Sequence, residues 1–350
     1  MKDDREGFSY PVINEDLCIH CDACVKVCPL KKEQTKTDTS LFIAAKNLSD
    51  EVRKSSSSGG VFTAISDWVL KQNGVIYGVV YDRDFSAMHA RAETPQERDA
   101  MRVSKYLQSR MDDTFQNVKT DLATGRLVLF TGTPCQVDGL KSFLKKEYDN
   151  LITADVVCHG VPSPLMFAEH IQHLQNVKKS KVVAYACRSK ELGWHRHIEK
   201  ATFQNGKVEY GTPLGQEHKT LFYAGHILRP SCYECHYSNL QRPSDITLAD
   251  FWGVEKCMPE YADQIGISLL LVNNKKGEKI LAEIASCLEY RKSTSFGRQP
   301  NLERSSDRPP NREAFWNLYF SRGYKAVAAK YGRNGFKQNL KYRIKKLLKM

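Results

Sequence analysis

The order of strand and helix patterns between residues 127 and 176 constrains the fold most strongly. Two apolar runs rich in β-branched residues, LVLFT at 127–131 and LITADVVC at 151–158, are each followed by a short turn and a helical pattern, at about 136–148 and 165–176. A strand, helix, strand, helix order of this kind implies parallel strands joined by right-handed crossovers. The sequence therefore predicts an α/β core.

The regions on either side extend this core into a mixed sheet. Upstream, a helical pattern from Val61 to Val69 precedes the strand-like run VIYGVVYD, and a second helix is expected over 113–123. Downstream, the alternating runs KVVAYACR, HIEKATF and KVEYG are followed by DITLADFWG, by ISLLLV and by a helical pattern over 277–288. With 350 residues the chain is long enough for two to three domains.

Four cysteines near the amino end follow the spacing of bacterial ferredoxins. Cys18, Cys21, Cys24 and Cys28, with Pro29 after the last, spell C-x2-C-x2-C-x3-C-P, which is the ligand run of a 4Fe-4S cluster. Three thiolates at intervals of three can hold three corners of one cube, whereas zinc sites usually split their ligands into two separated pairs. We therefore expect an iron-sulfur head at this end.

The ligand role of Cys28 has two interpretations. In two-cluster ferredoxins the fourth cysteine of such a run ligates the other cluster, and the sequence shows no second run of this type. Either Cys28 completes a single cluster, or a partner motif is missing. Because GFSYPVINEDLC resembles the segment that joins two ferredoxin motifs, we expect that a first motif stood before Met1 and was lost or left out.

A second set of cysteines is predicted from the core. Cys135 follows the first core strand and Cys158 ends the second. Because parallel strands end at the same edge, both cysteines are expected at the carboxyl edge of the sheet, where open α/β folds place their sites. With the pair Cys232 and Cys235 they supply four thiolates for a second cluster or for zinc. Alternatively, Cys135 and Cys158 are small buried residues of the core.

The remaining cysteines and the compartment follow from similar arguments. Cys187, Cys257 and Cys287 are expected to be core thiols, with a reserve role as a fourth ligand of the amino-terminal cluster. The start MKDDREGFSY has no secretory-signal pattern, so we expect a reducing cytoplasm, in which disulfides are disfavoured. The longest apolar runs fall far short of the ~18 to 20 residues that span a bilayer.

Five segments, in order, resemble one known family. SSSSGGVFTAI, SKYLQS, FTGTPCQVDGLKSFL, CHGVPSP and CYECHYSNLQRPSDITLADFWG are similar to the coenzyme F-420 hydrogenase/dehydrogenase beta-subunit family over about residues 18–288. This family includes beta subunits of deazaflavin-reducing hydrogenases and formate dehydrogenases, and a plant enzyme that reduces hydroxymethyl chlorophyll with ferredoxin. The resemblance implies FAD and a core 4Fe-4S cluster. It implies that Cys135, Cys158, Cys232 and Cys235 ligate that cluster.

The resemblance also draws attention to a loop of serines and glycines. Ser57, Ser58, Gly59 and Gly60 stand before a helix amino terminus, where free N–H groups and the helix dipole suit a phosphate. Lys105 of SKYLQS would neutralise such a phosphate. We expect the pyrophosphate of FAD there; the alternative is a helix cap next to a serine-rich connector.

The expected architecture has five parts. It is an α/β protein with a small ferredoxin-like iron-sulfur head, an α/β core with a mixed sheet and a basic helical tail. The parts are a 4Fe-4S ferredoxin-type segment (1–35), a connector (36–57), the family's amino-terminal α/β domain (58–148), its carboxyl-terminal domain (149–293), and a linker with the tail (294–350).

The net charge of +12 belongs mostly to the carboxyl end. Residues 322–350 contain ten Lys and Arg and no Asp or Glu, which leaves +2 for the rest of the chain. Phe336, Leu340, Ile344 and Leu347 follow a helical spacing among these cations, which predicts a basic amphipathic helix. It is expected to contact a membrane surface or an acidic partner such as a ferredoxin, or else to pack its apolar face on the protein.

These observations favour an enzyme. A flavin- and 4Fe-4S-dependent oxidoreductase would pass electrons between a ferredoxin-like carrier and an organic two-electron substrate. One alternative is a non-catalytic electron-transfer or redox-responsive subunit of a larger complex, and another is the beta subunit of a deazaflavin coenzyme reductase or dehydrogenase. A ferredoxin or a hydrogenase or dehydrogenase subunit is the expected partner. Nucleic acid is not expected, because CIHCDACVKVCP and CYECHYSN are nearly neutral.

Overall fold

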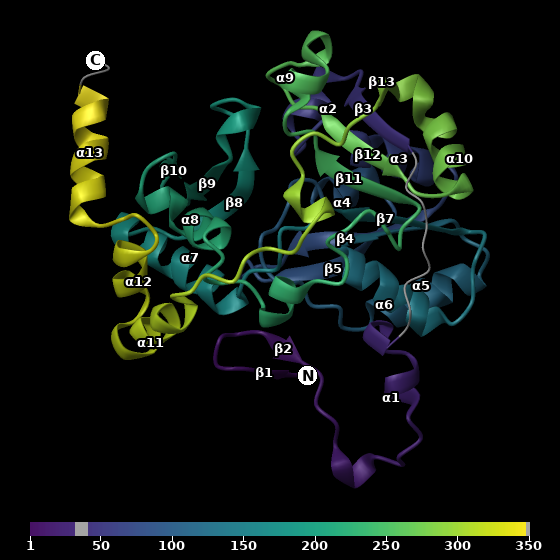
Figure 1. Ribbon diagram of the computed structural model, residues 1–350, viewed down its shortest axis with the longest axis horizontal. Coiled ribbons are helices and arrows are strands. Elements are labelled where there is room, and N and C mark those ends of the chain that lie inside the picture. Colours follow the sequence, from purple (N-terminus) through teal and green to yellow (C-terminus); the bar gives the residue numbers. More distant parts are fainter. Residues whose placement is uncertain (32–40, 348–350) are drawn as a thin grey trace.

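A computed structural model describes residues 1–31 and 41–347 and places an eight-stranded mixed sheet at the centre of the protein (Figure 1). Its strands, in order across the sheet, are β13 (Leu288–Ser293), β3 (Leu41–Asn47), β12 (Ser268–Val272), β11 (Ile246–Asp250), β7 (Leu151–Val156), β6 (Val128–Gly132), β4 (Val75–Tyr81) and β5 (Ala87–Ala92). The sheet confirms the predicted α/β class.

Strand direction separates the middle of the sheet from its edges. β11, β7, β6 and β4 are parallel, as the strand and helix order predicts. β12 runs antiparallel between β11 and β3, and the edge strands β13 and β5 are also antiparallel to their neighbours. All five residues of β12 are buried, as expected for a strand that is covered on both faces.

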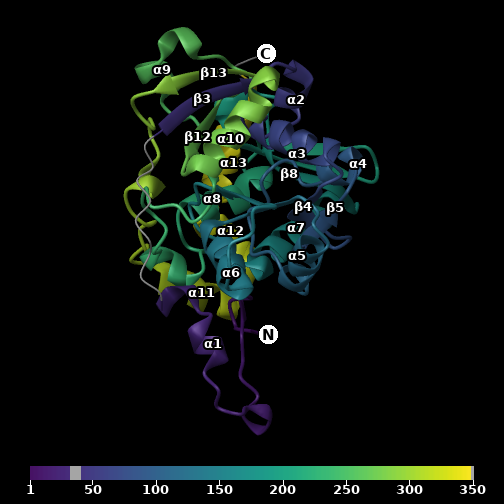
Figure 2. The same cartoon turned by 90° about the vertical axis from the view of Figure 1, so that its right-hand side faces the viewer.

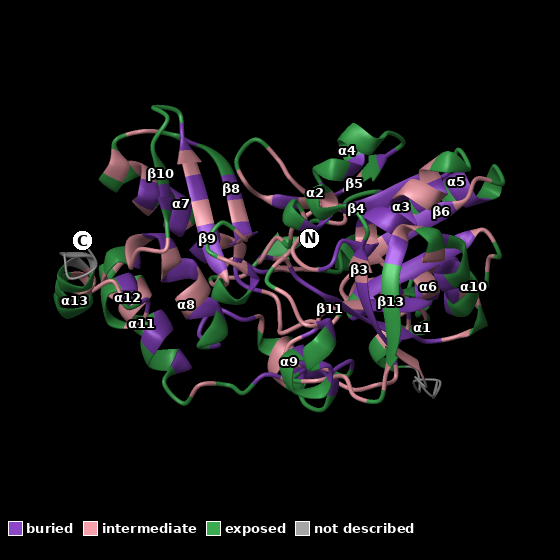
Figure 3. Ribbon diagram, turned by 90° about the horizontal axis from the view of Figure 1, so that it is seen from above, coloured by how far each residue is buried: buried purple, intermediate pink, exposed green. Residues whose placement is uncertain are grey.

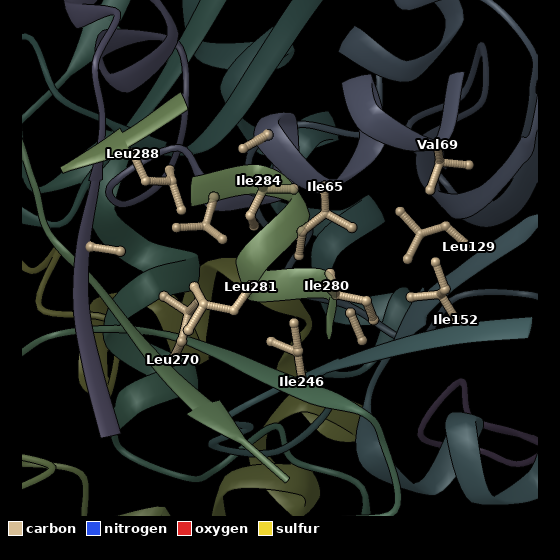
Figure 4. Packing of buried hydrophobic residues seen from close by; sticks show 14 of the residues in the cluster. Ile65, Val69, Leu129, Ile152, Ile246, Leu270, Ile280, Leu281, Ile284 and Leu288 are labelled. Atoms are coloured by element: carbon tan, nitrogen blue, oxygen red, sulfur yellow. The ribbon is translucent and has the colours of Figure 1, made fainter. Parts of the chain in front are cut away.

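Helices cover both faces of this sheet. The first face carries α3 (Val61–Lys71) and α10 (Lys275–Ile284), and Figure 4 shows their isoleucines and leucines packed on side chains of the strands. The second face carries α5 (Thr114–Ala123) and α6 (Pro134–Leu144). Alternate residues of one strand serve the two layers, since Leu129 packs under α3 while Val128 and Phe130 pack under α5 and α6.

A smaller unit lies beside the large sheet (Figure 1). Its antiparallel sheet contains β8 (Val182–Ser189), β9 (Ile198–Phe203) and β10 (Val208–Tyr210). The helices of this unit are α7 (Pro164–Lys178), α8 (Glu217–Tyr223), α11 (Arg312–Arg322) and α12 (Tyr324–Lys330). The chain leaves the large sheet after β7 and returns to it at β11. The expected boundary between residues 148 and 149 therefore falls inside the large sheet, between the paired strands β6 and β7.

Two segments differ from the expectation. Leu41–Asn47, expected in a connector, forms β3 inside the sheet. The local sequence does not predict this strand, because its partners β12 and β13 lie more than two hundred residues away. The expected linker after residue 294 packs on the protein, where Leu302 is buried and Ser306 contacts His159. Three helices complete the core: α2 (Asp50–Lys54), α4 (Pro95–Asp99) and α9 (Val254–Cys257).

The cysteine loop of the head and the tail helix project from this body. The head contains β1 (Lys2–Asp3), β2 (Ser9–Tyr10) and α1 (Ala23–Lys26), and its cysteine loop extends away from the sheet in Figures 1 and 2. The predicted basic tail helix is α13 (Phe336–Leu347). The short 3-10 helices are η1 (Glu15–Leu17), η2 (Pro29–Lys31), η3 (Trp194–Arg196), η4 (Leu214–Gln216), η5 (Pro230–Glu234), η6 (Pro259–Tyr261), η7 (Ala285–Cys287) and η8 (Pro300–Leu302). Across the described residues, no helix combines the length and the apolar character that crossing a bilayer would require.

Candidate cofactor site at the carboxyl edge of the sheet

The sequence-predicted residues of the core gather at one edge of the large sheet. β3, β4, β6, β7 and β11 all end at this edge, because each runs parallel to the others. Cys135 follows β6 and Cys158 follows β7, while Ser57 to Gly60 lie between α2 and α3. This edge is where open α/β sheets bind ligands.

Two loops bring the four core cysteines together. Cys135 opens α6, whose first turn is capped by Thr133, and the Thr133 hydroxyl lies 3.1 Å from the Cys135 sulfur. Cys232 and Cys235 lie in and directly after η5. The Val161 N–H donates to the Cys232 sulfur at 3.4 Å, which joins this loop to the one that carries Cys158.

Burial and the neighbouring thiols together raise the pKa values of these cysteines. Burial is the main cause of a strongly raised pKa at Cys158, and the charges of Cys232, Cys135 and Cys235 add to it. Burial also raises the pKa of Cys232 to about 12, again with contributions from Cys135 and Cys235. Burial is also the main cause of the raised pKa of Cys135, and the hydrogen bond with the Thr133 hydroxyl opposes it.

The donor chemistry of this set suits iron and sulfide. All four cysteines are free thiols, and soft thiolates are the ligands that iron-sulfur clusters take. Within residues 1–31 and 41–347, no three His, Cys, Asp or Glu side chains are already arranged to hold a metal ion. Binding of an iron-sulfur cluster would therefore require the four thiols to move closer together, since a metal site is rarely preformed.

The cysteines of the head lie in an exposed loop. Cys21 and Cys24 are exposed, and Cys18 and Cys28 are half-buried. His20 and Asp22 adopt left-handed conformations, with φ of 53° and 56°, which turn the chain sharply between the cysteines.

The helix α6 connects the two cysteine sets. A cavity of about 360 Å³ separates the head from the end of α6, and Cys24, Phe143 and Leu144 line it. Cys135 stands at the opposite end of α6. Because α6 has 11 residues, the two ends lie roughly 16 Å apart at 1.5 Å per residue.

The predicted serine and glycine loop meets the second predicted motif. The Ser104 N–H donates to the Ser57 hydroxyl at 3.0 Å. The Ser58 hydroxyl donates to the Ile267 carbonyl at 2.7 Å, and the Gly59 N–H donates to the Ser268 hydroxyl at 2.9 Å. The loop is thus fixed against the start of β12, directly before the amino terminus of α3.

Lysines near this loop differ in what they contact. The Lys105 ammonium donates to the carbonyls of Ala100 and Arg102 at 2.7 and 2.8 Å, and burial lowers its pKa to about 7. Lys190, which sequence reasoning missed, donates to the Ser58 carbonyl at 2.5 Å. Burial lowers the pKa of Lys190 to about 7 as well. Of these two lysines, Lys190 is therefore the one whose ammonium contacts the loop directly.

A group of aromatic and charged side chains adjoins the loop. The indole rings of Trp194 and Trp252 stack with centroids 4.7 Å apart. The Arg188 Nη1 donates to Asp250 at 2.7 Å, and the Trp194 Nε1–H donates to the same carboxylate at 3.0 Å. The Arg188 side chain is 4% exposed. Its Nη2 makes no hydrogen bond of good geometry among the described residues, although the Tyr106 side chain lies near enough to affect the Arg188 pKa. The DFWG motif of the sequence indicated Asp250 and Trp252, and nothing in the sequence singled out Arg188.

A chain of ring contacts links the core cysteines to this group. The ring of His159, which follows Cys158, lies 5.4 Å from that of Tyr223. The Tyr223 hydroxyl is 3.0 Å from His197 Nδ1, and the His197 ring lies 4.4 Å from Trp252. Burial, assisted by the nearby Arg188 cation, lowers the pKa of His197 to about 4, so this imidazole is neutral at pH 7.

The three expected core thiols have different environments. Cys187 is buried in β8 beside the Tyr81 hydroxyl, as predicted. Cys287 is half-buried and packs against the core under α10. The expectation for Cys257 is wrong: it is exposed, because α9 is a single turn that presents this residue to solvent.

Comparison with known proteins identifies two parts of the chain. Residues 125–294 match the family that describes the carboxyl-terminal part of the coenzyme F420 hydrogenase/dehydrogenase beta subunit, and residues 11–31 match the 4Fe-4S binding domain. A chain of the F420-reducing [NiFe] hydrogenase complex from Methanosarcina barkeri is similar in structure, with 18% identity and a TM-score of 0.49 over 72% of this chain and 81% of that one. No curated protein matches the sequence.

Proposed function

Because residues 125–294 match the coenzyme F420 hydrogenase/dehydrogenase beta-subunit family and residues 11–31 match a 4Fe-4S binding domain, we propose that the chain is an iron-sulfur flavoprotein oxidoreductase. Electrons would pass between a ferredoxin-like carrier or partner subunit and an organic two-electron substrate, through the head, the core cysteines and FAD. The observation that carries the proposal is that four thiols lie near one another at one sheet edge and are linked by a chain of ring contacts to a buried aromatic and cationic group.

The cysteine sets would hold the electron relay. In the proposal, Cys18, Cys21 and Cys24 ligate the head cluster, with Cys28 as the fourth ligand. Cys135, Cys158, Cys232 and Cys235 ligate the core cluster (their grouping is supported by the mutual effect on their pKa values). The length of α6 supports a relay, since it brings the two sets within one short helix of each other.

The aromatic and cationic group fits a flavin. FAD, when bound, accepts and donates electrons singly or as a hydride, which matches one-electron clusters to a two-electron substrate. The orphaned Nη2 of Arg188 would donate to a phosphate or to a ring carbonyl, and Trp252 would stack on the ring system. Ser57, Ser58, Gly59 and Gly60 would hold the pyrophosphate at the start of α3, with Lys190 nearer than Lys105.

The glycines of this loop are not by themselves evidence for a ligand. A Cβ on Gly59 would come within 2.3 Å of the Ala45 carbonyl oxygen, so packing alone requires glycine there. Gly60 has φ of 85° as the residue before α3, a conformation that glycine adopts at little cost. The support for FAD therefore comes from Arg188 and Trp252.

A deazaflavin coenzyme is one candidate for the organic two-electron substrate. The matched family is described by its coenzyme F420 enzymes, so oxidised F420 is the first acceptor to test with a reduced ferredoxin as donor. Bleaching of the deazaflavin absorbance would support this alternative. A protein that binds FAD but leaves F420 unchanged would keep the flavoprotein proposal and exclude this substrate.

The decisive experiment is anaerobic reconstitution of the full chain with iron, sulfide and FAD. We expect visible spectra that contain both the broad iron-sulfur absorption and the resolved flavin bands, with both bleached by dithionite. A preparation that acquires iron and sulfide but no flavin would overturn the flavoprotein proposal. It would leave a non-catalytic electron-transfer subunit as the function.

A further inference from the structure

The helix α13 exposes an apolar face. Phe336, Leu340 and Ile344 are 83%, 47% and 46% exposed. They are four residues apart and so lie on one side of the helix. In Figures 1 and 3, α13 stands at one end of the molecule, beyond α12, and most of its surface is exposed. Of the alternatives expected for this face, packing on the protein is therefore wrong for the three side chains that the structure describes.

Cations border this apolar face. Lys337, Lys341 and Lys345 are exposed and each follows one of the three apolar residues in sequence, so they form a parallel row along the helix. No Asp or Glu occurs from residue 314 to residue 350. The surface therefore combines an apolar stripe with a dense positive charge and no internal neutralisation.

The start of α13 is attached to the smaller unit. Asn334 donates to the buried carboxylate of Glu217 in α8. Asn339 in turn donates to the Asn334 carbonyl and side-chain oxygens at 3.1 and 2.8 Å. The helix thus starts from a fixed point, and the exposure of its apolar residues is a property of where the fold places it.

We propose that α13 is an interfacial helix that binds the surface of an anionic lipid bilayer. The apolar residues would enter the boundary between head groups and acyl chains, while the lysines would reach the lipid phosphates with their long stems along the surface. An acidic protein would neutralise the lysines, but it would need an added apolar groove to cover Phe336, Leu340 and Ile344. A bilayer supplies both kinds of contact at once, whatever the redox function of the core.

The test is binding of the full, reconstituted chain to sedimented vesicles. We expect binding to vesicles that contain phosphatidylglycerol and little binding to vesicles of phosphatidylcholine alone. K337Q/K341Q/K345Q removes three cations that would lie near the anionic lipid surface, so the partition coefficient is expected to fall roughly 100-fold. F336S/L340S/I344S is expected to lose binding at moderate salt.

A matched control separates this helix from net charge. K71Q/K275Q/K279Q removes the same charge from exposed lysines of α3 and α10 and should bind like the unchanged protein. Equal weakening by both lysine variants would overturn the proposal, because net charge alone would then explain binding. Unchanged binding by the serine variant would also overturn it. The absence of any vesicle binding would overturn the proposal too. This includes a result in which the protein binds an acidic redox carrier through these lysines but binds no vesicles. Circular dichroism of each variant checks that the fold is retained.

Discussion

Replacement of Gly59 by alanine tests whether this glycine is required by packing. The new Cβ would lie 2.3 Å from the Ala45 carbonyl oxygen and 2.6 Å from the Ser268 nitrogen. Both atoms belong to the backbone of buried neighbouring strands, so neither can rotate away as a side-chain end would. The loop must therefore move away from the sheet.

The cost follows from what this movement disturbs. Overpacking of a buried site costs about 1 to 3 kcal/mol. The displacement would also weaken two hydrogen bonds, from the Gly59 N–H to the Ser268 hydroxyl and from the Asn47 N–H to the Gly59 carbonyl, at about 1 kcal/mol each. We therefore expect G59A to lower the free energy of unfolding by about 2 to 5 kcal/mol.

Urea unfolding followed by circular dichroism, with FAD omitted, measures this loss without a contribution from ligand binding. G139A is the matched control, because a Cβ at Gly139 in α6 meets only Phe115 at an ordinary 3.5 Å. Alanine inside a helix should stabilise by up to about 1 kcal/mol. A G59A protein that unfolds at the same urea concentration as the unchanged chain, yet fails to bind FAD, would refute the packing argument and show that Gly59 serves a ligand.

Three further predictions concern the cofactors. C158S should lower the iron content of the reconstituted protein by about four atoms per chain, the content of one 4Fe-4S cluster, whereas the half-buried C287S should not; equal iron in both would remove Cys158 from the ligand set. R188M should weaken FAD binding in a fluorescence titration by roughly 10- to 150-fold, the value of a charged hydrogen bond of about 1.5 to 3 kcal/mol, and the exposed R83M should leave it unchanged. Because burial places the pKa of Lys190 at about 7, its cation is present below pH 7 and lost above it, so FAD affinity should fall about tenfold from pH 6 to pH 8; a K190M protein with the same pH dependence would contradict this assignment.

Local patterns predicted those elements of the fold whose burial is visible in a short stretch of sequence. β6 and β7 are continuous apolar runs because α3 and α10 cover one face and α5 and α6 the other. β3 was missed because its short apolar stretch stands in a polar region and its partners are distant in sequence. Cys257 was misplaced for the opposite reason, since one turn of helix gives too short a pattern to distinguish a buried face from an exposed one.

The candidate site divides in the same way. The cysteines could be recognised in the sequence because iron-sulfur ligands follow a local spacing and because parallel strands end at a common edge. Arg188 could not be recognised, because its place in the candidate site depends on Asp250 and Trp194, which come from another strand and another loop. The apolar spacing of α13 predicted an amphipathic helix, but only the structure shows that Phe336 and Leu340 remain uncovered.

The sequence by itself determined the chemistry that this protein can carry: a ferredoxin-type cysteine run, two thiols at the ends of parallel strands, and a basic amphipathic helix. Each of these depends on residues within a few turns or strands of one another. The tertiary structure decided which of these groups meet. It linked Cys158 to Trp252 through the rings of His159, Tyr223 and His197, and it left the tail helix uncovered. The physical reason is that such meetings arise from strand pairing and packing between distant segments, and no local periodicity records which distant segments will pair.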